Sequence, residues 1–144
     1  MLYPVEKFNV SVVVVTYNRK YLLLDCIKAL LNQTTTINKI YIINNNSMDG
    51  TNELLEKSNI LKNDKIHLVN LKENIGGAGG FNYGMNLAYQ EGSDYIWLMD
   101  DDTITLSNSL ENLLRAYKIL VNKNIGFACS HVEWIDKTPH KMNI

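Results

Sequence analysis

Cysteine is scarce in this chain of 144 residues, which contains two, Cys26 and Cys129. Two cysteines are too few for the disulfide framework of a small secreted domain, and neither stands near a histidine in the spacing of a zinc site. Both have apolar neighbours in the sequence. We therefore expect two free, buried thiols in a protein of a reducing compartment.

Long apolar runs are also absent. No stretch approaches the roughly 20 residues of a membrane-spanning helix, and residues 1–9 lack the basic start and apolar centre of a secretion signal. We expect a cytoplasmic location, with peripheral attachment at the inner face of a membrane as the alternative. Neither charge is in excess, since the net charge is −1, so the composition predicts no nucleic acid as partner.

The length is enough for one compact domain with a core and too short for two. We expect a single domain over residues 1–144, in which the polar and patternless residues 136–144 are frayed.

Short β-branched runs alternate with segments whose apolar residues recur at helical spacing. The apolar runs predict strands at 10–15, 39–43, 66–71, 95–99 and 125–132. The helical spacing predicts helices at 21–33, 51–60, 81–89 and 110–121, with a glycine-rich turn at 76–80 before the third of them. This alternation predicts an α/β fold: a doubly wound, mainly parallel sheet with helices on both faces.

Polar and glycine-rich segments follow four of the predicted strands. They are Thr16 to Asn18, Asn44 to Asn46, Asn74 to Gly80 and Asp100 to Asp102. In a doubly wound sheet, ligands bind outside the carboxyl ends of the strands. We therefore expect these segments to meet at one edge of the sheet and to form the site.

Three adjacent carboxylates, Asp100, Asp101 and Asp102, stand at the exit of an apolar strand and repel one another. A cation is expected there. An oxygen-only cluster suits a divalent ion such as Mg2+ or Mn2+, which commonly bridges protein carboxylates to the phosphates of a nucleotide. The alternative is an acidic loop that leads into a helix at about Ser107.

The glycines at 76–80 follow a strand, but their spacing and position differ from the dinucleotide-binding fingerprint, so an NAD site is disfavoured. They allow close approach of the backbone and leave the N–H groups of a helix start free to face a diphosphate. The alternative is a tight turn with close helix packing.

The segment 44–51 is rich in residues that form turns and helix caps. Alternatively, the amide of Asn45 pairs with the polar edge of a base, because it offers both a donor and an acceptor. Tyr17 would then cover the face of that base and Thr16 would contribute a hydroxyl.

Four segments in this order resemble the motifs of the family 2 glycosyltransferases. They read Val-Val-Thr-Tyr-Asn at 14–18, Asn-Asn-Asn-Ser-Met-Asp-Gly-Thr at 44–51, Glu-Asn-Ile-Gly-Gly-Ala-Gly-Gly-Phe at 73–81 and Trp-Leu-Met-Asp-Asp-Asp at 97–102. The resemblance covers most of the chain. It implies the nucleotide-binding half of the GT-A fold and the N-terminal part of a longer glycosyltransferase.

The resemblance also implies site residues. Those that would contact the nucleotide sugar are Thr16, Tyr17, Asn18, Asn45, Asn74, Gly76, Gly77, Gly79, Asp100 and Asp101. Asp100 and Asp102 resemble the pair linked to Mn2+ or Mg2+. Family members usually carry two aspartates where this chain has Asn44 and Asn45. Many relatives have an arginine where Phe81 stands. The combination Gly-Gly-Ala-Gly-Gly-Phe at 76–81 instead resembles the subgroup that contains galactofuranosyltransferases and some rhamnosyltransferases.

The implied reaction is inverting transfer of a hexose from a UDP- or dTDP-sugar to a hydroxyl of a glycan or lipid-linked acceptor, in polysaccharide or cell-wall synthesis. The divalent ion would neutralise charge on the leaving diphosphate. Relatives supply the general base from a later part of the chain, so we expect it beyond residue 144 and expect this chain alone to be inactive. Two alternatives are a non-catalytic nucleotide-sugar-binding module or partner-dependent subunit, and an unrelated nucleotide-binding α/β protein. Association into a homo-oligomer is left open.

Overall fold

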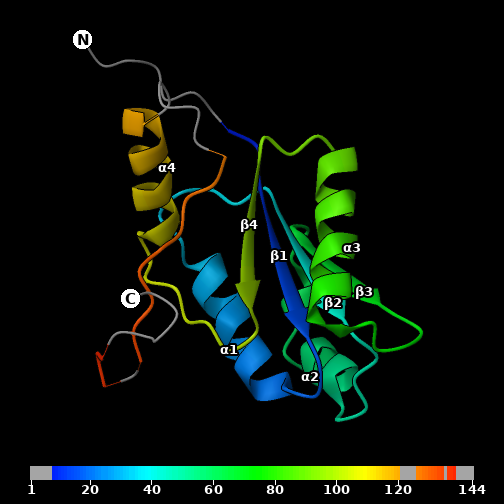
Figure 1. The fold of residues 1–144 in the computed structure, drawn as a ribbon. Coiled ribbons are helices and arrows are strands. Elements are labelled where there is room, and N and C mark those ends of the chain that lie inside the picture. The colour runs from blue at the N-terminus through cyan, green and yellow to red at the C-terminus, as the bar shows by residue number, and fades with distance from the viewer. Residues whose placement is uncertain (1–7, 121–125, 135, 139–144) are drawn as a thin grey trace.

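The computed structural model describes residues 8–120, 126–134 and 136–138. Strands and helices alternate along the chain (Figure 1). In order they are β1 (Val10–Thr16), α1 (Lys20–Leu31), β2 (Lys39–Asn44), α2 (Thr51–Lys57), the 3-10 helix η1 (Ile60–Lys62), β3 (Ile66–Asn70), α3 (Gly76–Gln90), β4 (Tyr95–Asp100) and α4 (Ser109–Leu120). The predicted helix at 51–60 is thus divided into α2 and η1, because Asn59 takes a left-handed conformation between them.

The four strands form one parallel sheet in the order β3-β2-β1-β4. The chain runs outward from β1 through β2 to β3, and then returns to the other side of β1 to form β4 (Figure 1). The direction of winding therefore changes between β1 and β4. In doubly wound folds, the crevice outside the carboxyl ends of the strands at such a switch point is the usual ligand site.

Helices cover both faces of the sheet, so the predicted fold class is confirmed. On one face, α1, α2 and α4 enclose a core that includes Val12, Leu23 and Leu110. On the other face, α3 packs on β1 and β2 over a smaller core that includes Val13 and Ile43. Every residue of β1 is buried. This explains why its sequence is almost wholly apolar rather than alternating.

The predicted glycine-rich turn is wrong, because helix α3 already begins at Gly76. The reason is packing. A Cβ on Gly80 would lie 2.7 Å from Val15 Cγ1, and one on Gly84 would lie 2.3 Å from Val13 Cγ1. Both distances are too short for carbon atoms in contact, so α3 approaches the sheet more closely than any residue with a side chain allows. Of the alternative, a tight turn with close helix packing, the packing is confirmed and the turn is not.

The predicted fifth strand, at 125–132, is also wrong over residues 126–132, which the structure describes. Residues 126–132 form no strand and are exposed, and so is Cys129, which we expected to be buried. A strand in a core also needs a covered face, and every residue from 126 to 132 is exposed. Residues 139–144 of the predicted frayed end lie outside the described residues.

Cys26 is buried beside Met99, as predicted, and burial together with the nearby aspartates raises the pKa of its thiol to about 12. The thiol therefore stays protonated at neutral pH and acts as a small apolar side chain. Both cysteines are free thiols. None of the described helices has the length and apolar character that crossing a membrane requires.

Candidate functional site

The ends of β1 and β4 are joined by a buried hydrogen bond at the switch point. Pairing of these strands aligns Val15 with Asp100, and so places the residues that follow side by side. The Thr16 hydroxyl donates to Asp101 Oδ2 at 2.7 Å. Thr16 and Asp101 are both buried, with exposed fractions of 1% and 3%. Two of the predicted site residues thus meet, and Asp101 points into the protein rather than into the crevice.

Arg19 completes this group, and the sequence analysis missed it. Its guanidinium Nη1 lies 2.9 Å from Asp102 Oδ2 and 3.5 Å from Asp101 Oδ1. Arg19 is the residue that precedes α1, in the loop that follows β1. The available signal was its position directly after Thr16 to Asn18, which places a positive charge at the same edge as the aspartates.

Burial of the Asp101 carboxyl raises its pKa, and the neighbouring Asp102 acts in the same direction. The hydrogen bond from Thr16 and the guanidinium of Arg19 act against this rise without cancelling it. A charge on Asp101 is therefore costly in this position. Its partners on β1 and in the β1–α1 loop are what make that charge tolerable.

Asp100 and Asp102 are exposed at the end of β4. No three histidine, cysteine or acidic side chains gather as a complete set of metal ligands in the part of the chain that the structure describes. Mg2+ commonly takes only one or two protein carboxylates and completes its shell with phosphate oxygens and water. The donor set at this edge fits such an ion, and the Arg19 guanidinium already provides a positive charge beside Asp102. The metal site remains a prediction.

Asn18 ties the loop after β1 to the loop after β2. It lies at φ +54°, in the left-handed region that asparagine tolerates. Its backbone N–H donates to Ser47 Oγ at 2.9 Å, and its side-chain Oδ1 accepts from the Met48 N–H at 2.8 Å. Neighbouring Tyr17 is 48% exposed. The ring of Tyr17 is thus presented from a braced loop, with part of its surface open to a ligand.

Asn45 clamps the entry of α3. Its side-chain nitrogen donates to the Gly76 carbonyl at 2.9 Å, and its Oδ1 accepts from the Ile75 N–H at 3.1 Å. The residue is 2% exposed. Each end of the amide already bonds backbone, so pairing with a base edge would have to use the second N–H and the second lone pair or replace these bonds. Asn44 is likewise engaged, by Asn52, Asn70 and Ser47.

The remaining predicted residues form the start of α3. Asn74 Oδ1 accepts from the Gly76 N–H at 2.8 Å, and Gly76 has φ +75°, which favours glycine. A Cβ on Gly77 would meet no atom within 4 Å, so this position is open. A Cβ on Gly79 would lie 2.9 Å from a side-chain carbon of Ile75. Gly79 therefore serves packing, whereas Gly76 and Gly77 leave the helix start uncovered.

Asp49 holds the beginnings of two helices at once. Its Oδ2 accepts from the Lys20 N–H at 3.0 Å, at the first residue of α1, and its Oδ1 accepts from the Thr51 N–H at 3.1 Å, at the first residue of α2. Burial has the largest single effect on the pKa of Asp49 and raises it. The hydrogen bonds from Thr51 and Lys20 and the Lys20 ammonium outweigh burial, so the pKa of Asp49 is lowered.

We expect Asp49→Asn to lower the free energy of unfolding at pH 7 by about 1–2 kcal/mol, because an amide has one acceptor oxygen where two are used. A lowered pKa in the folded state stabilises the fold above the ordinary value of 3.8, and this contribution is lost as the pH falls through the folded pKa. The difference between the two proteins should therefore shrink in acid. Urea unfolding at several pH values measures it.

Asp64→Asn is the matched control, since Asp64 is exposed and should change stability by no more than about 0.5 kcal/mol. Equal stability of Asp49→Asn and the unaltered protein at pH 7 would contradict the double capping role.

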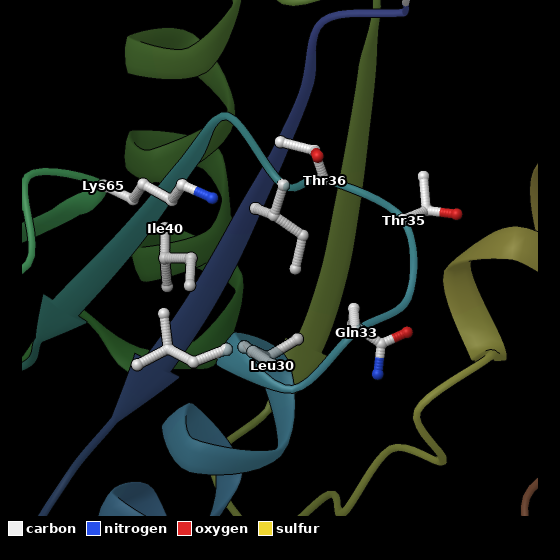
Figure 2. Close-up of a pocket in the computed structure, with 8 residues that line it drawn as sticks. Leu30, Gln33, Thr35, Thr36, Ile40 and Lys65 are labelled. Atoms are coloured by element: carbon white, nitrogen blue, oxygen red, sulfur yellow. The ribbon is translucent and has the colours of Figure 1, made fainter. Parts of the chain in front are cut away.

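A cavity of about 90 Å³ lies at the opposite edge of the sheet, between the end of α1, the segment that follows it and the start of β2 (Figure 2). Ligand pockets usually measure about 300 Å³ or more. This cavity is too small for a nucleotide, and it lies away from the carboxyl ends of the strands. Its lining residues are Leu30, Leu31, Gln33, Thr35, Thr36, Ile37, Ile40 and Lys65.

Curated proteins similar to this chain are glycosyltransferases. An uncharacterised glycosyltransferase of Acanthamoeba polyphaga mimivirus is 29% identical over 149 residues, which cover 91% of this chain and 60% of that protein. The galactofuranosyltransferase GlfT1 of Mycolicibacterium smegmatis is 33% identical over 93 residues, which cover 65% of this chain and 30% of that protein. The chain thus spans between 30% and 60% of the length of these two relatives.

Solved structures show the same fold. A mannosyltransferase of Pyrobaculum calidifontis in complex with GDP-Man and Mn2+ matches with a TM-score of 0.71 at 23% identity, over 91% of this chain and 37% of that one. TarS of S. aureus in complex with UDP matches with a TM-score of 0.65 at 16% identity, over 90% of this chain and 43% of that one. At these identities the likeness concerns the GT-A fold. The family model "Glycosyl transferase family 2" matches residues 11–140, so the chain belongs to glycosyl transferase family 2.

Proposed function

We propose that this chain forms the donor- and metal-binding side of a glycosyltransferase that moves a sugar from a nucleoside diphosphate to an acceptor hydroxyl. The observation that carries the proposal is the meeting of Thr16, Arg19, Asp101 and Asp102 at the switch point of the sheet. Structural needs alone do not explain three consecutive aspartates of which one is buried. A nucleotide that brings a divalent ion does explain them.

The diphosphate would lie across the ends of β1 and β2, between the aspartates and the start of α3. Helix α3 has 15 residues and no acidic side chain in its first turn, so the positive end of its dipole is not compensated there. The open positions Gly76 and Gly77 leave space beside its first N–H groups. The bound ion would be held by Asp102 with Asp100 and would neutralise charge on the leaving diphosphate.

The nucleoside would rest against Tyr17, whose ring is half exposed in the braced loop after β1. Base contact by Asn45 stays part of the proposal, through the donor and acceptor capacity that its bonds to Gly76 and Ile75 leave or by replacement of one of these bonds. Asn45 also supports the proposal in another way, since it positions the start of α3 near the donor. We propose a UDP- or dTDP-sugar as donor. The GDP-Man bound by the archaeal neighbour adds a third base to the test.

Inversion at the sugar, an acceptor of glycan or lipid-linked type and a role in polysaccharide or cell-wall synthesis are the finer parts of the proposal. They rest on the resemblance of the motifs at 14–18, 44–51, 73–81 and 97–102 to those of the family 2 glycosyltransferases. Because GlfT1 is a galactofuranosyltransferase, a galactofuranosyl donor is the first to test. A rhamnosyl donor is the second, because the motif resemblance extends to some rhamnosyltransferases.

Isothermal calorimetry with UDP-, dTDP- and GDP-sugars, each with Mn2+ and again with EDTA, tests the donor site. We expect binding of at least one donor and its loss with EDTA. Absence of binding by every donor would overturn the proposal. A transfer assay with the donor that binds then separates an enzyme from a binding module. Binding without transfer would favour the module, or a subunit whose acceptor side is supplied elsewhere.

A further inference from the structure

Arg19 holds the position beside Asp102 in which a divalent ion is expected. Its Nη1 lies 2.9 Å from Asp102 Oδ2, and the two side chains are 52% and 49% exposed. The side chain of Asp101, in contrast, is 95% buried, and it accepts a hydrogen bond from Thr16 on its other side. Asp101 therefore keeps a partner when Arg19 moves. Asp102 has no other hydrogen-bond or ion-pair partner among the described residues.

A divalent ion and a guanidinium repel each other when both lie against Asp102, and this repulsion favours departure of the guanidinium. Exposed ion pairs between long side chains contribute little net stability, so an ion with its phosphate ligands can displace the guanidinium at low cost. Once displaced, Arg19 remains anchored by its backbone directly before α1, at the edge where the diphosphate is proposed to lie. Its planar group of N–H donors matches phosphate oxygens.

We infer that Arg19 occupies Asp102 while the site holds no divalent ion, and that ion binding transfers its guanidinium from this carboxylate to the diphosphate of the donor. The inference rests on the proposed function. Arg19 then links the two ligands: it competes with the ion alone, and it assists the ion when nucleotide is present. Because such coupling is reciprocal, the ion must raise nucleotide affinity by the same factor.

The test is a titration of the full 144-residue chain with Mn2+, read by the electron paramagnetic resonance signal of free Mn2+, first alone and then with UDP. In Arg19→Gln we expect Mn2+ alone to bind about 5-fold more tightly or better, at the lower end of typical couplings, because the competing charge is gone. UDP should raise the Mn2+ affinity of the unaltered protein by a larger factor than that of Arg19→Gln.

Arg115→Gln is the matched control, since Arg115 is an exposed arginine that pairs with Glu111 at 2.9 Å on α4. It should titrate as the unaltered protein does. Arg19→Lys keeps a competing charge without the planar donor group, so Mn2+ alone should bind as in the unaltered protein while the gain from UDP falls. Thermal unfolding followed by circular dichroism shows whether each variant is folded. If Arg19→Gln does not fold, Arg19→Lys tests the inference in its place.

Equal or weaker binding of Mn2+ alone by Arg19→Gln would overturn the inference, and so would failure of both proteins to bind Mn2+. An equal gain from UDP in both proteins would also overturn it. Of these results, only failure to bind Mn2+ bears on the proposed function, because it removes the metal from it. The donor part stands as long as the unaltered protein binds a nucleotide sugar by calorimetry. If calorimetry detects no donor, the proposed function fails regardless of how Mn2+ binds.

Discussion

Gly84→Ala should lower the free energy of unfolding by about 3 kcal/mol, at the upper end of the usual cost of overpacking a core. A methyl group on Gly84 would lie 2.3 Å from Val13 Cγ1 and 3.1 Å from Ile43 Cγ1. Val13 and Ile43 are fully buried on adjacent central strands, so they have no space into which to move. Helix α3 must therefore shift away from the sheet. Urea unfolding followed by circular dichroism measures the change.

Gly77→Ala is the control, because it makes the same substitution in the same helix where a Cβ meets no atom within 4 Å. Alanine is the better helix former, so this variant should be as stable as the unaltered protein or more stable by up to about 1 kcal/mol. A loss of stability in Gly84→Ala without a loss in Gly77→Ala separates the effect of packing from that of helix propensity. An unchanged unfolding midpoint of Gly84→Ala would contradict the close contact between α3 and β1.

Asp102→Asn should weaken Mn2+-dependent donor binding by about 100-fold or more, since even residues that only orient metal ligands cost about 10- to 100-fold when mutated. The substitution keeps the shape of the side chain and removes its charge. Asp102 is exposed, so stability should change by no more than about 0.5 kcal/mol. Calorimetry with the donor and Mn2+ measures the affinity, and urea unfolding verifies the fold.

Asp25→Asn is the matched control for this prediction. Asp25 is an exposed aspartate on α1 that pairs with a basic side chain, Lys28, as Asp102 pairs with Arg19. Its loss should leave donor binding unchanged. Donor affinity in Asp102→Asn equal to that of the Asp25 variant would mean that the ion is held without Asp102.

The strands were predictable because their signal is strong and local. The run from Val10 to Val15 is β-branched and almost wholly apolar, and only a strand covered on both faces explains it. That the polar segments after the strands gather at one edge of the sheet was predictable for a related reason. Parallel strands all end at one edge, so residues that follow them must lie there whatever the strand order is.

The start of α3 could not be predicted, because two effects compete there. Glycine is a poor helix former, at a cost of about 1 kcal/mol relative to alanine, and four of the five residues from Gly76 to Gly80 are glycine. That composition favours a turn. The close approach of α3 to Val13 and Val15 requires residues without side chains at two positions. This contact exists only once the sheet has formed.

The prediction of a fifth strand was wrong because a local pattern was present without the tertiary contacts that a strand needs. Residues 126–132 carry the apolar pattern of a strand, but the pattern shows only that they could pair, not that a partner edge and a covering layer are present. Phe127 is 83% exposed in the structure. Cys129 was mispredicted as buried with it.

The amino-acid sequence by itself determined the α/β alternation, the edge at which the polar segments gather and the family, because these depend on local periodicity and on motif order. Only the tertiary structure decided that Arg19 meets Asp101 and Asp102, that Thr16 locks Asp101 and that Asn45 holds the start of α3. The contacts of Asp101 and Asp102 require β4 to lie beside β1, and the contact of Asn45 requires α3 to pack on β1 and β2. Strand order results from how the whole chain packs, and no single segment encodes it.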